Sequence, residues 1–157
     1  MKKIAIFADV QNIYYTTREA YGRQFNYRKL WQRISNEGEI VTAIAYAIDR
    51  NDDQQTKFQD ALKHIGFTVK LKPFIQRRDG SAKGDWDVGI TIDVLETAQS
   101  VDTVVLLSGD GDFDLLLDKI SKDYGVNVEV YGVPALTANS LIAAASIYHP
   151  IEEDLLL

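Results

Sequence analysis

Short apolar runs alternate with helical patterns along this chain, and this alternation restricts its possible folds more than any other feature. Residues 3–8 form an unbroken, largely apolar run, which is typical of a strand buried on both faces. Comparable runs recur at about 40–48, 67–74, 103–107 and 127–131. Each of these runs is short enough to be a single strand rather than a buried helix.

The segments between these runs carry helical patterns that begin at polar N-caps and end near glycines. Strands that alternate with helices are typical of a parallel sheet covered on both faces. We therefore predict a three-layer α/β/α sandwich with a mostly parallel central sheet of about five strands, forming one domain over residues 1–157. Segment 147–157 could be a packed C-terminal arm or a disordered end. Helices are predicted at about 26–38, 52–66, 85–98, 112–125 and 137–145.

The composition excludes several classes of protein. The chain has no cysteine, so disulfides, thiolate catalysis and zinc sites built on sulfur are excluded. The apolar run at the N-terminus is too short for a signal peptide, and Asp9 interrupts it. No segment approaches the roughly 20 apolar residues that span a bilayer. We expect a cytoplasmic protein with no membrane partner.

The net charge bears on possible partners. With 17 basic and 23 acidic residues the formal charge is 17 − 23 = −6, whereas nucleic-acid-binding proteins usually carry a basic surface. A nuclease that gathers carboxylates to bind divalent cations can nevertheless be acidic overall. The charge therefore counts against a nucleic-acid partner without excluding one.

Acidic residues follow two of the predicted strands at the point where each strand ends. Asp9 ends the first strand, and Asp110 and Asp112 come directly after the strand at 103–107. Ligands of open α/β sheets bind beyond the carboxyl ends of the strands, where the strand order reverses. If these two strands are neighbours, the three carboxylates converge at one crevice.

The predicted helix at 85–98 carries two further acids. Asp87 lies in its first turn, where the helix dipole favours a carboxylate. Asp93 lies in the middle between apolar residues, where an ionised group is costly without a partner. Lys83 or the Thr91 hydroxyl could be that partner. Asp85 is interpreted as a surface or capping residue, and so is Asp114.

Several carboxylates in one crevice repel one another, and a divalent cation relieves that repulsion. Oxygen ligands without sulfur suit Mg²⁺ or Mn²⁺, which can activate water and neutralise charge on a phosphate. Taken singly, each acid has a structural explanation: Asp9 as a cap, Asp87 as a match for the helix dipole, and Asp110 with Asp112 as turn residues. Their joint placement favours a metal site.

Other motifs with related residues do not fit. Residues 110–121 open like a calcium-binding EF-hand loop, but Leu115 replaces the required glycine and Ser121 the closing glutamate. Residues 109–114 lack the third glycine of a dinucleotide-binding fingerprint. We do not expect a catalytic role for either histidine, His64 or His149.

Three short blocks resemble the NYN domain family, a PIN-like group that includes LabA-like and DUF88 proteins. Residues 9–12 (DVQN) are similar to its D-x-x-N opening. Residues 83–88 (KGDWDV), together with Asp93, are similar to its K-G-x-x-D-V block. Residues 108–113 (SGDGDF) are similar to its S-G-D-x-D-F block. The three blocks occur in the family order, within about residues 4–116.

The resemblance implies a PIN-like fold and a metal-dependent nuclease that hydrolyses mainly RNA. It implies that the catalytic, metal-binding site is formed by Asp9, Asp87, Asp110 and Asp112. It also implies that Asn12 and Ser108 orient these acids through hydrogen bonds. Lys83 would contact phosphate, and Asp93 would support the site.

A candidate substrate-binding strip precedes the second block. Its basic residues could follow the backbone of single-stranded RNA while Phe74 and Trp86 stack bases, or the strip could be a solvated strand edge and loop. The tyrosines at 14, 15 and 21 could line a substrate groove or pack a helix onto the sheet. The basic residues of the strip are Lys70, Lys72, Arg77 and Arg78.

Two other functions remain open. The chain could be a regulatory module that keeps the acidic pocket, is weakly active or inactive, and binds RNA or a protein. It could also be a phosphotransferase that uses Asp110 or Asp112 as a nucleophile. The sequence is also compatible with a homodimer.

Overall fold

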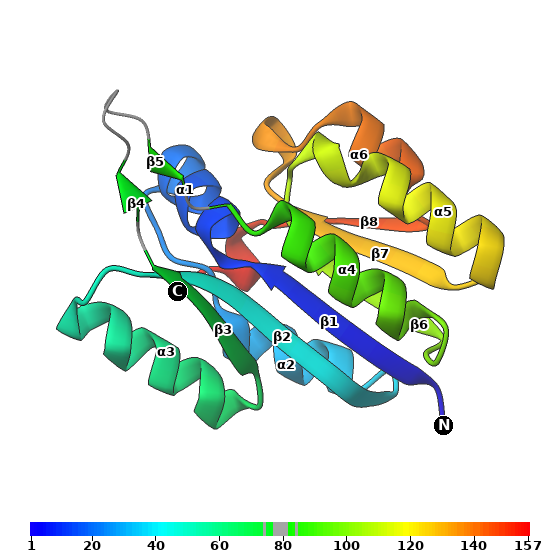
Figure 1. Cartoon of the computed structure of the whole chain (residues 1–157), viewed down its shortest axis with the longest axis horizontal. Coiled ribbons are helices and arrows are strands. Elements are labelled where there is room, and N and C mark those ends of the chain that lie inside the picture. Colours follow the sequence, from blue (N-terminus) through cyan, green and yellow to red (C-terminus); the bar gives the residue numbers. More distant parts are fainter. Residues whose placement is uncertain (74, 77–81, 84) are drawn as a thin grey trace.

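A six-stranded, all-parallel sheet forms the centre of the protein in the computed structural model, which describes residues 1–73, 75–76, 82–83 and 85–157 (Figure 1). The strand order is β3-β2-β1-β6-β7-β8. The predicted three-layer α/β architecture is therefore confirmed. The strands are β1 (Lys3–Asp9), β2 (Glu39–Asp49), β3 (Thr68–Pro73), β6 (Thr103–Leu107), β7 (Asn127–Gly132) and β8 (Ile147–Pro150).

Helices cover both faces of this sheet. On one face, α1 (Val10–Tyr21), α2 (Tyr27–Ser35) and α3 (Asp53–Ile65) share a hydrophobic core with the sheet. On the other face, α4 (Asp87–Ala98), α5 (Asp114–Tyr124) and α6 (Asn139–Ala144) form a second core, and α4 and α5 cross in front of the strands in Figure 1. The smaller elements are β4 (Ile75–Gln76), β5 (Ala82–Lys83), η1 (Gly111–Phe113), η2 (Pro134–Leu136) and η3 (Glu153–Leu155).

The two cores explain why β1 reads as an unbroken apolar run. Ile4, Ile6 and Ala8 contribute to the core under α1 and α2, and Ala5 and Phe7 contribute to the core under α4 and α5. All five side chains are fully buried. A strand buried on both faces has no polar side, so its sequence does not alternate.

The strand order places the reversal point of the sheet between β1 and β6. From β1 the chain moves outward through β2 to β3, and it then returns to the other side of β1 as β6. The register pairs Ala8 with Leu107, so the carboxyl ends of β1 and β6 lie side by side. Because these two strand ends are adjacent, the acidic residues that follow them can lie close together, as the sequence predicted.

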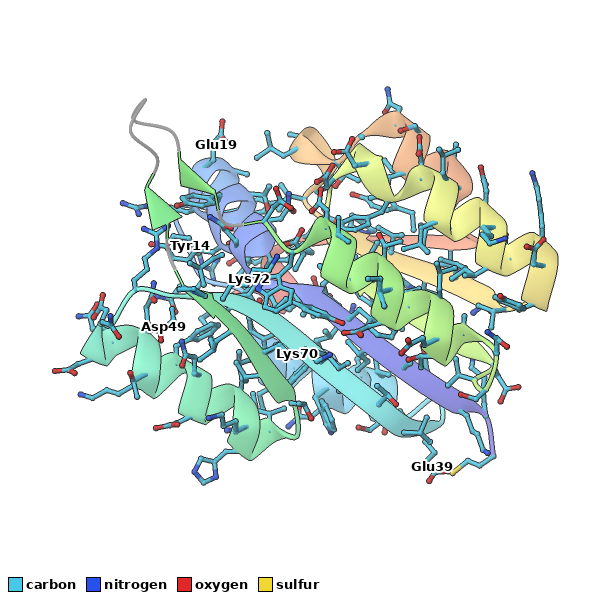
Figure 2. All side chains as sticks on the ribbon, viewed as in Figure 1. Tyr14, Glu19, Glu39, Asp49, Lys70 and Lys72 are labelled. Carbon is cyan, nitrogen blue, oxygen red and sulfur yellow. The ribbon has the colours of Figure 1, made fainter. Side chains whose placement is uncertain are left out.

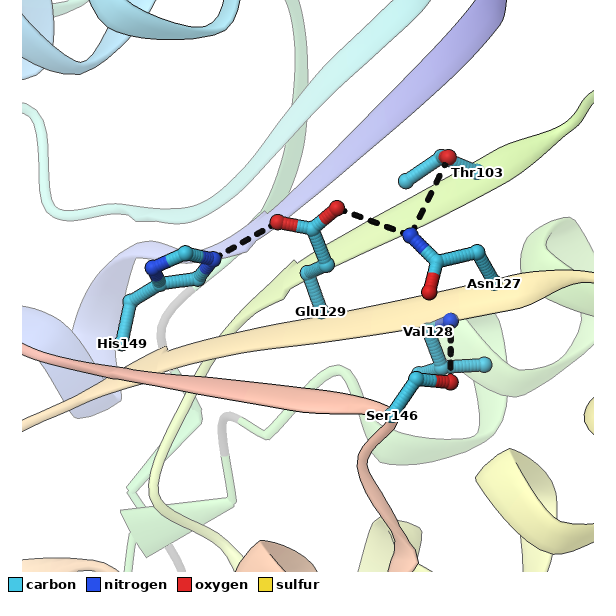
Figure 3. Close-up of polar contacts among 6 residues, drawn as sticks. All are labelled: Thr103, Asn127, Val128, Glu129, Ser146 and His149. Carbon is cyan, nitrogen blue, oxygen red and sulfur yellow. Dashed lines mark hydrogen bonds and ion pairs between the residues drawn. The ribbon is translucent and has the colours of Figure 1, made fainter.

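The C-terminal segment contributes a sixth strand, one more than the sequence predicted. β8 pairs in parallel with β7, and Ile151 and Leu155 beyond it are fully buried. Its residue His149 has Nε2 at 2.6 Å from Oε1 of buried Glu129 on β7 (Figure 3). The segment is therefore a packed arm, held by strand pairing, by buried apolar side chains and by the contact between His149 and Glu129.

Helix α1 is also additional to the predicted elements. Its buried residues are only Val10, Ile13 and Thr17, and Tyr14 and Tyr15 face solvent. An apolar stripe this narrow, with two exposed aromatic residues beside it, gives a weak helical pattern. Among the described parts of the chain, no helix is both long enough and apolar enough to cross a membrane.

Candidate metal centre

A hydrogen-bonded frame joins the ends of β1 and β6. Asp9 closes β1 and caps α1, and its carboxylate accepts a hydrogen bond from the Ser108 hydroxyl at 3.1 Å. The Asn12 side-chain oxygen accepts the Gly109 backbone N–H at 2.9 Å. The Ser108 hydroxyl oxygen in turn accepts the backbone N–H of Asp110 at 3.1 Å. The residues expected to orient the acids therefore connect the two strand ends.

Three carboxylates gather beside this frame. Asp110 precedes the short helix η1 and accepts the backbone N–H of Asp112 at 2.9 Å. Asp87 is the first residue of α4. One carboxylate oxygen from each of these three residues lies within 4.8 Å of the others. Asp9 is buried next to them, hydrogen-bonded to Ser108, and is not a member of this close set.

Burial and mutual repulsion strongly perturb two of the four acids. Desolvation, followed by the charges of Asp110 and Asp85, raises the pKa of Asp87 from 3.8 to about 7. Burial raises the pKa of Asp9 from 3.8 to about 6, although the hydrogen bonds from Ser108 and Asn12 act in the opposite direction. Burial therefore disfavours the ionised forms of both Asp87 and Asp9.

Asp85 belongs to the same electrostatic environment. Its Oδ1 accepts the backbone N–H of Asp87 at 3.2 Å, and its exposure agrees with its interpretation as a surface residue. Its charge also raises the pKa of both Asp87 and Asp9, a role that the sequence reading missed. Its position in the sequence, two residues before Asp87, could have indicated this electrostatic role.

Asp93 lies apart from the cluster and has its own partners. Its Oδ2 accepts the Tyr46 hydroxyl at 2.8 Å and lies 2.7 Å from the Lys70 ammonium nitrogen. The expected partner Thr91 instead donates its hydroxyl to the backbone oxygen of Asp87 at 2.7 Å. The side chain of the other expected partner, Lys83, lies outside the described part of the structure. The arrangement links α4 to β2 and β3.

The two lysines of the basic strip have different partners in this region. The Lys70 charge is paired with Asp93, whereas the Lys72 ammonium lies 4.6 Å from the centre of the Trp86 ring. Lys72 also donates to the backbone oxygen of Asp85 at 3.1 Å, which places it near the acidic cluster. The other members of the strip, Phe74, Arg77 and Arg78, lie outside the described residues.

The donors at this site fit a hard divalent cation. Asp87, Asp110 and Asp112 offer oxygens that are close enough to share one ion, and carboxylates are the ligands that Mg²⁺ and Mn²⁺ prefer. Burial, followed by the nearby charge of Asp110, raises the pKa of Asp87, so its ionised form is disfavoured when no positive charge lies beside it. A cation would remove that penalty.

Comparisons with known proteins find relatives that cover nearly the whole chain. The family model of the NYN domain matches residues 3–152. The low amplitude and bright protein LabA of Synechococcus elongatus is 30% identical over 154 residues, which are 93% of this chain and 82% of that protein. A crystal structure of a protein of unknown function from Vibrio parahaemolyticus is 55% identical with a TM-score of 0.94, covering 99% of this chain and 96% of that one.

More distant structures share the fold alone. A carbohydrate kinase from Agrobacterium tumefaciens superposes with a TM-score of 0.53 at 15% identity, over 94% of this chain and 60% of the kinase. A ribokinase from Giardia lamblia gives 0.52 at 11% identity, over 96% of this chain and 58% of that one. At this level of identity the match reflects the common α/β layering and carries no implication for chemistry.

Proposed function

This chain belongs to the NYN domain family, and from that premise we propose that it is a Mg²⁺- or Mn²⁺-dependent ribonuclease that hydrolyses phosphodiester bonds of single-stranded RNA in the cytoplasm. One observation carries the proposal. The carboxylate oxygens of Asp87, Asp110 and Asp112 lie within 4.8 Å of one another, at the edge of the sheet where the strand order reverses.

The proposed roles follow from the contacts of each residue. Asp87, Asp110 and Asp112 would hold the cation, and Asp9 would complete the site from its buried position beside them. A bound cation would supply charge neutralisation at the phosphate and activation of a water molecule. Asn12 belongs to the orienting frame, because its side chain is bonded to the backbone of Gly109 next to the acids.

The hydrogen-bonded frame restricts the movement of the acidic residues. The Ser108 hydroxyl donates to Oδ2 of Asp9 and accepts the backbone N–H of Asp110, so one side chain links the Asp9 carboxylate to the backbone that carries Asp110. A site held in this way needs little rearrangement when charge develops on the substrate. Lys72 could contact a phosphate of the substrate, because its ammonium already lies beside Asp85 and Trp86.

Cleavage of single-stranded RNA with Mn²⁺ or Mg²⁺ tests the proposal directly. Asp110→Asn keeps the size of the side chain and removes one metal-binding charge, so we expect a loss of at least about 100-fold in rate. Asp60→Asn, an exposed acid on α3, is the matched control and should cleave like the wild type. Equal cleavage by the wild type and Asp110→Asn would point to a contaminating nuclease and would reject the assignment.

A regulatory module that binds RNA or a protein is the second candidate. The net charge of −6 favours a protein over RNA as the partner of such a module, because an acidic surface holds RNA weakly. Calorimetric titration with Mn²⁺ separates the two candidates. Binding in the millimolar range or tighter supports the nuclease, and absence of binding supports the regulatory module. The homodimer stays a prediction that the same preparation can test by light scattering.

A further inference from the structure

One face of α1 exposes two neighbouring tyrosines. The side chains of Tyr14 and Tyr15 are 45% and 48% exposed, whereas the preceding residue, Ile13, is fully buried. Tyr21 on the same helix has a structural role, because its hydroxyl donates to the backbone oxygen of Ile151 at 2.7 Å. Tyr14 and Tyr15 have no comparable bond to the core in the described part of the chain, so their exposure calls for another explanation.

Arginines accompany both exposed rings. Arg18 donates to the Tyr14 hydroxyl at 3.0 Å, and its guanidinium carbon lies 5.9 Å from the centre of that ring. Arg50 donates to the Tyr15 hydroxyl at 3.4 Å. The two rings lie 5.4 Å apart at 74°, in an edge-to-face arrangement. This chain has a net charge of −6, and here it places two cations beside two exposed aromatic rings.

This surface borders the carboxyl edge of the sheet. Asp9 caps α1, and the helical rise of 1.5 Å per residue puts Tyr14 and Tyr15 about 8 Å along the axis from it. Arg50 follows β2 directly, and β2 is the neighbour of β1. Figure 2 shows Tyr14 on α1 and Lys72 near the end of β3. Glu19 lies one turn beyond Tyr15, farther from Asp9, and its charge would limit an anionic ligand on that side.

A shallow hollow adjoins the first of these tyrosines. Tyr14, Arg18, Gly22, Arg23 and Gln24 line it, and its volume is about 170 Å³. Pockets that enclose drug-sized ligands have volumes of roughly 300–1,000 Å³. A space of this size therefore suits a flat group that rests against the surface better than a ligand that is enclosed.

We propose that the surface formed by Tyr14, Tyr15, Arg18 and Arg50 is a subsite that stacks the bases and contacts the phosphates of single-stranded RNA beside the acidic cluster. Aromatic rings interleaved with cations bind single strands in this way, since every base has a face for stacking. The inference rests on the proposed function for its substrate class. It adds a surface on α1, which covers the opposite face of the sheet from Trp86.

The test is a binding measurement that does not depend on cleavage. A short fluorescein-labelled oligouridylate is titrated by anisotropy in EDTA with the full chain carrying Asp110→Asn. Adding Tyr14→Ala and Tyr15→Ala together should weaken binding about 5-fold or more, the equivalent of ~1 kcal/mol or more. The matched phenylalanine pair, Tyr14→Phe with Tyr15→Phe, keeps the rings and should retain most of the affinity.

Tyr124→Ala is the control for loss of an exposed tyrosine. Tyr124 is 39% exposed at the C-terminal end of α5, which leads into the opposite edge of the sheet, so this variant should bind as before. Equal affinity of the alanine pair and its parent would overturn the inference. A loss of affinity in the phenylalanine pair as large as in the alanine pair would overturn the stacking role. Unchanged RNA affinity with loss of a protein partner would reassign the surface to that partner.

The two proposals fail in different ways. If the wild type cleaves RNA in an Asp110-dependent manner while the alanine pair binds normally, only the subsite is rejected. If binding depends on the two tyrosines but the wild type cleaves nothing, the ribonuclease is rejected and the binding surface stands. Thermal unfolding of every variant checks that the fold is intact, and we expect midpoints close to that of the parent because the altered rings are exposed.

Discussion

Replacing Asp87 with asparagine should stabilise the metal-free protein at pH 8. Desolvation and the charges of Asp110 and Asp85 raise the pKa of Asp87 from 3.8 to about 7, so its ionised form is disfavoured in the folded state. Counted in full, a shift of about 3 pH units corresponds to ~4 kcal/mol. The side chain is only partly buried and solvent screens it, so we expect ~1–2 kcal/mol.

The sign of the pH dependence follows from linkage. Because the pKa of Asp87 is higher in the folded state, that state binds more protons between pH 3.8 and about 7, and the wild type gains stability as the pH falls through this window. The advantage of Asp87→Asn should therefore be largest above pH 7 and nearly lost by pH 4. Saturating Mn²⁺ should reverse the order, since the cation stabilises only a protein that binds it.

Thermal unfolding in EDTA and in Mn²⁺, at pH 8 and at pH 4, measures this effect. For a domain of this size, ~1–2 kcal/mol corresponds to a rise of about 2–8 °C in the midpoint. Asp60→Asn is the control, because it removes an exposed charge from α3, away from the cluster. A lower midpoint of Asp87→Asn in EDTA at pH 8 would refute the reasoning, because favourable partners would then hold the carboxylate.

Three further predictions concern the site and the C-terminal arm. The affinity for Mn²⁺ measured by calorimetry should fall as the pH drops from 8 to 5, because protons occupy Asp87 and Asp9, whose pKa values are about 7 and about 6; a flat profile would exclude both acids from the binding site. Gly109→Ala should cost ~1–3 kcal/mol in chemical denaturation, because its Cβ would lie 2.7 Å from the backbone oxygen of Leu136, and an unchanged midpoint would mean that this backbone moves aside. His149→Ala should cost ~1–3 kcal/mol in urea denaturation by leaving Oε1 of buried Glu129 without its partner at 2.6 Å, and equal stability would show that the pair does not hold β8.

The packing of the C-terminal arm could not be predicted from the sequence alone. Segment 147–157 mixes acids with apolar residues, so its composition alone was compatible with either a packed arm or a disordered end. Its packing depends on Glu129, which lies 20 residues away from His149 in the chain. A short strand of four residues carries too little periodicity to predict which strand it will join.

The acidic site was predicted in part. The positions of Asp9 and Asp110 follow from strand ends that the apolar runs mark, and the adjacency of β1 and β6 then brings them together. Asp87 lies on a helix, so its approach to Asp110 depends on how α4 crosses the sheet. Asp93 differs from these acids. It also matches the family block, but its carboxylate contacts Lys70 and Tyr46.

The sequence by itself determined the alternation of strands and helices, the burial of β1 on both faces, and the edge of the sheet at which the acids gather. These features depend on local periodicity and on the direction of the chain, which neighbouring residues encode. Only the tertiary structure decided which carboxylates meet, which one takes a lysine partner, and that the arm becomes a strand. Those outcomes depend on the rotation of helices and on partners distant in the chain, such as Tyr46, 47 residues before Asp93.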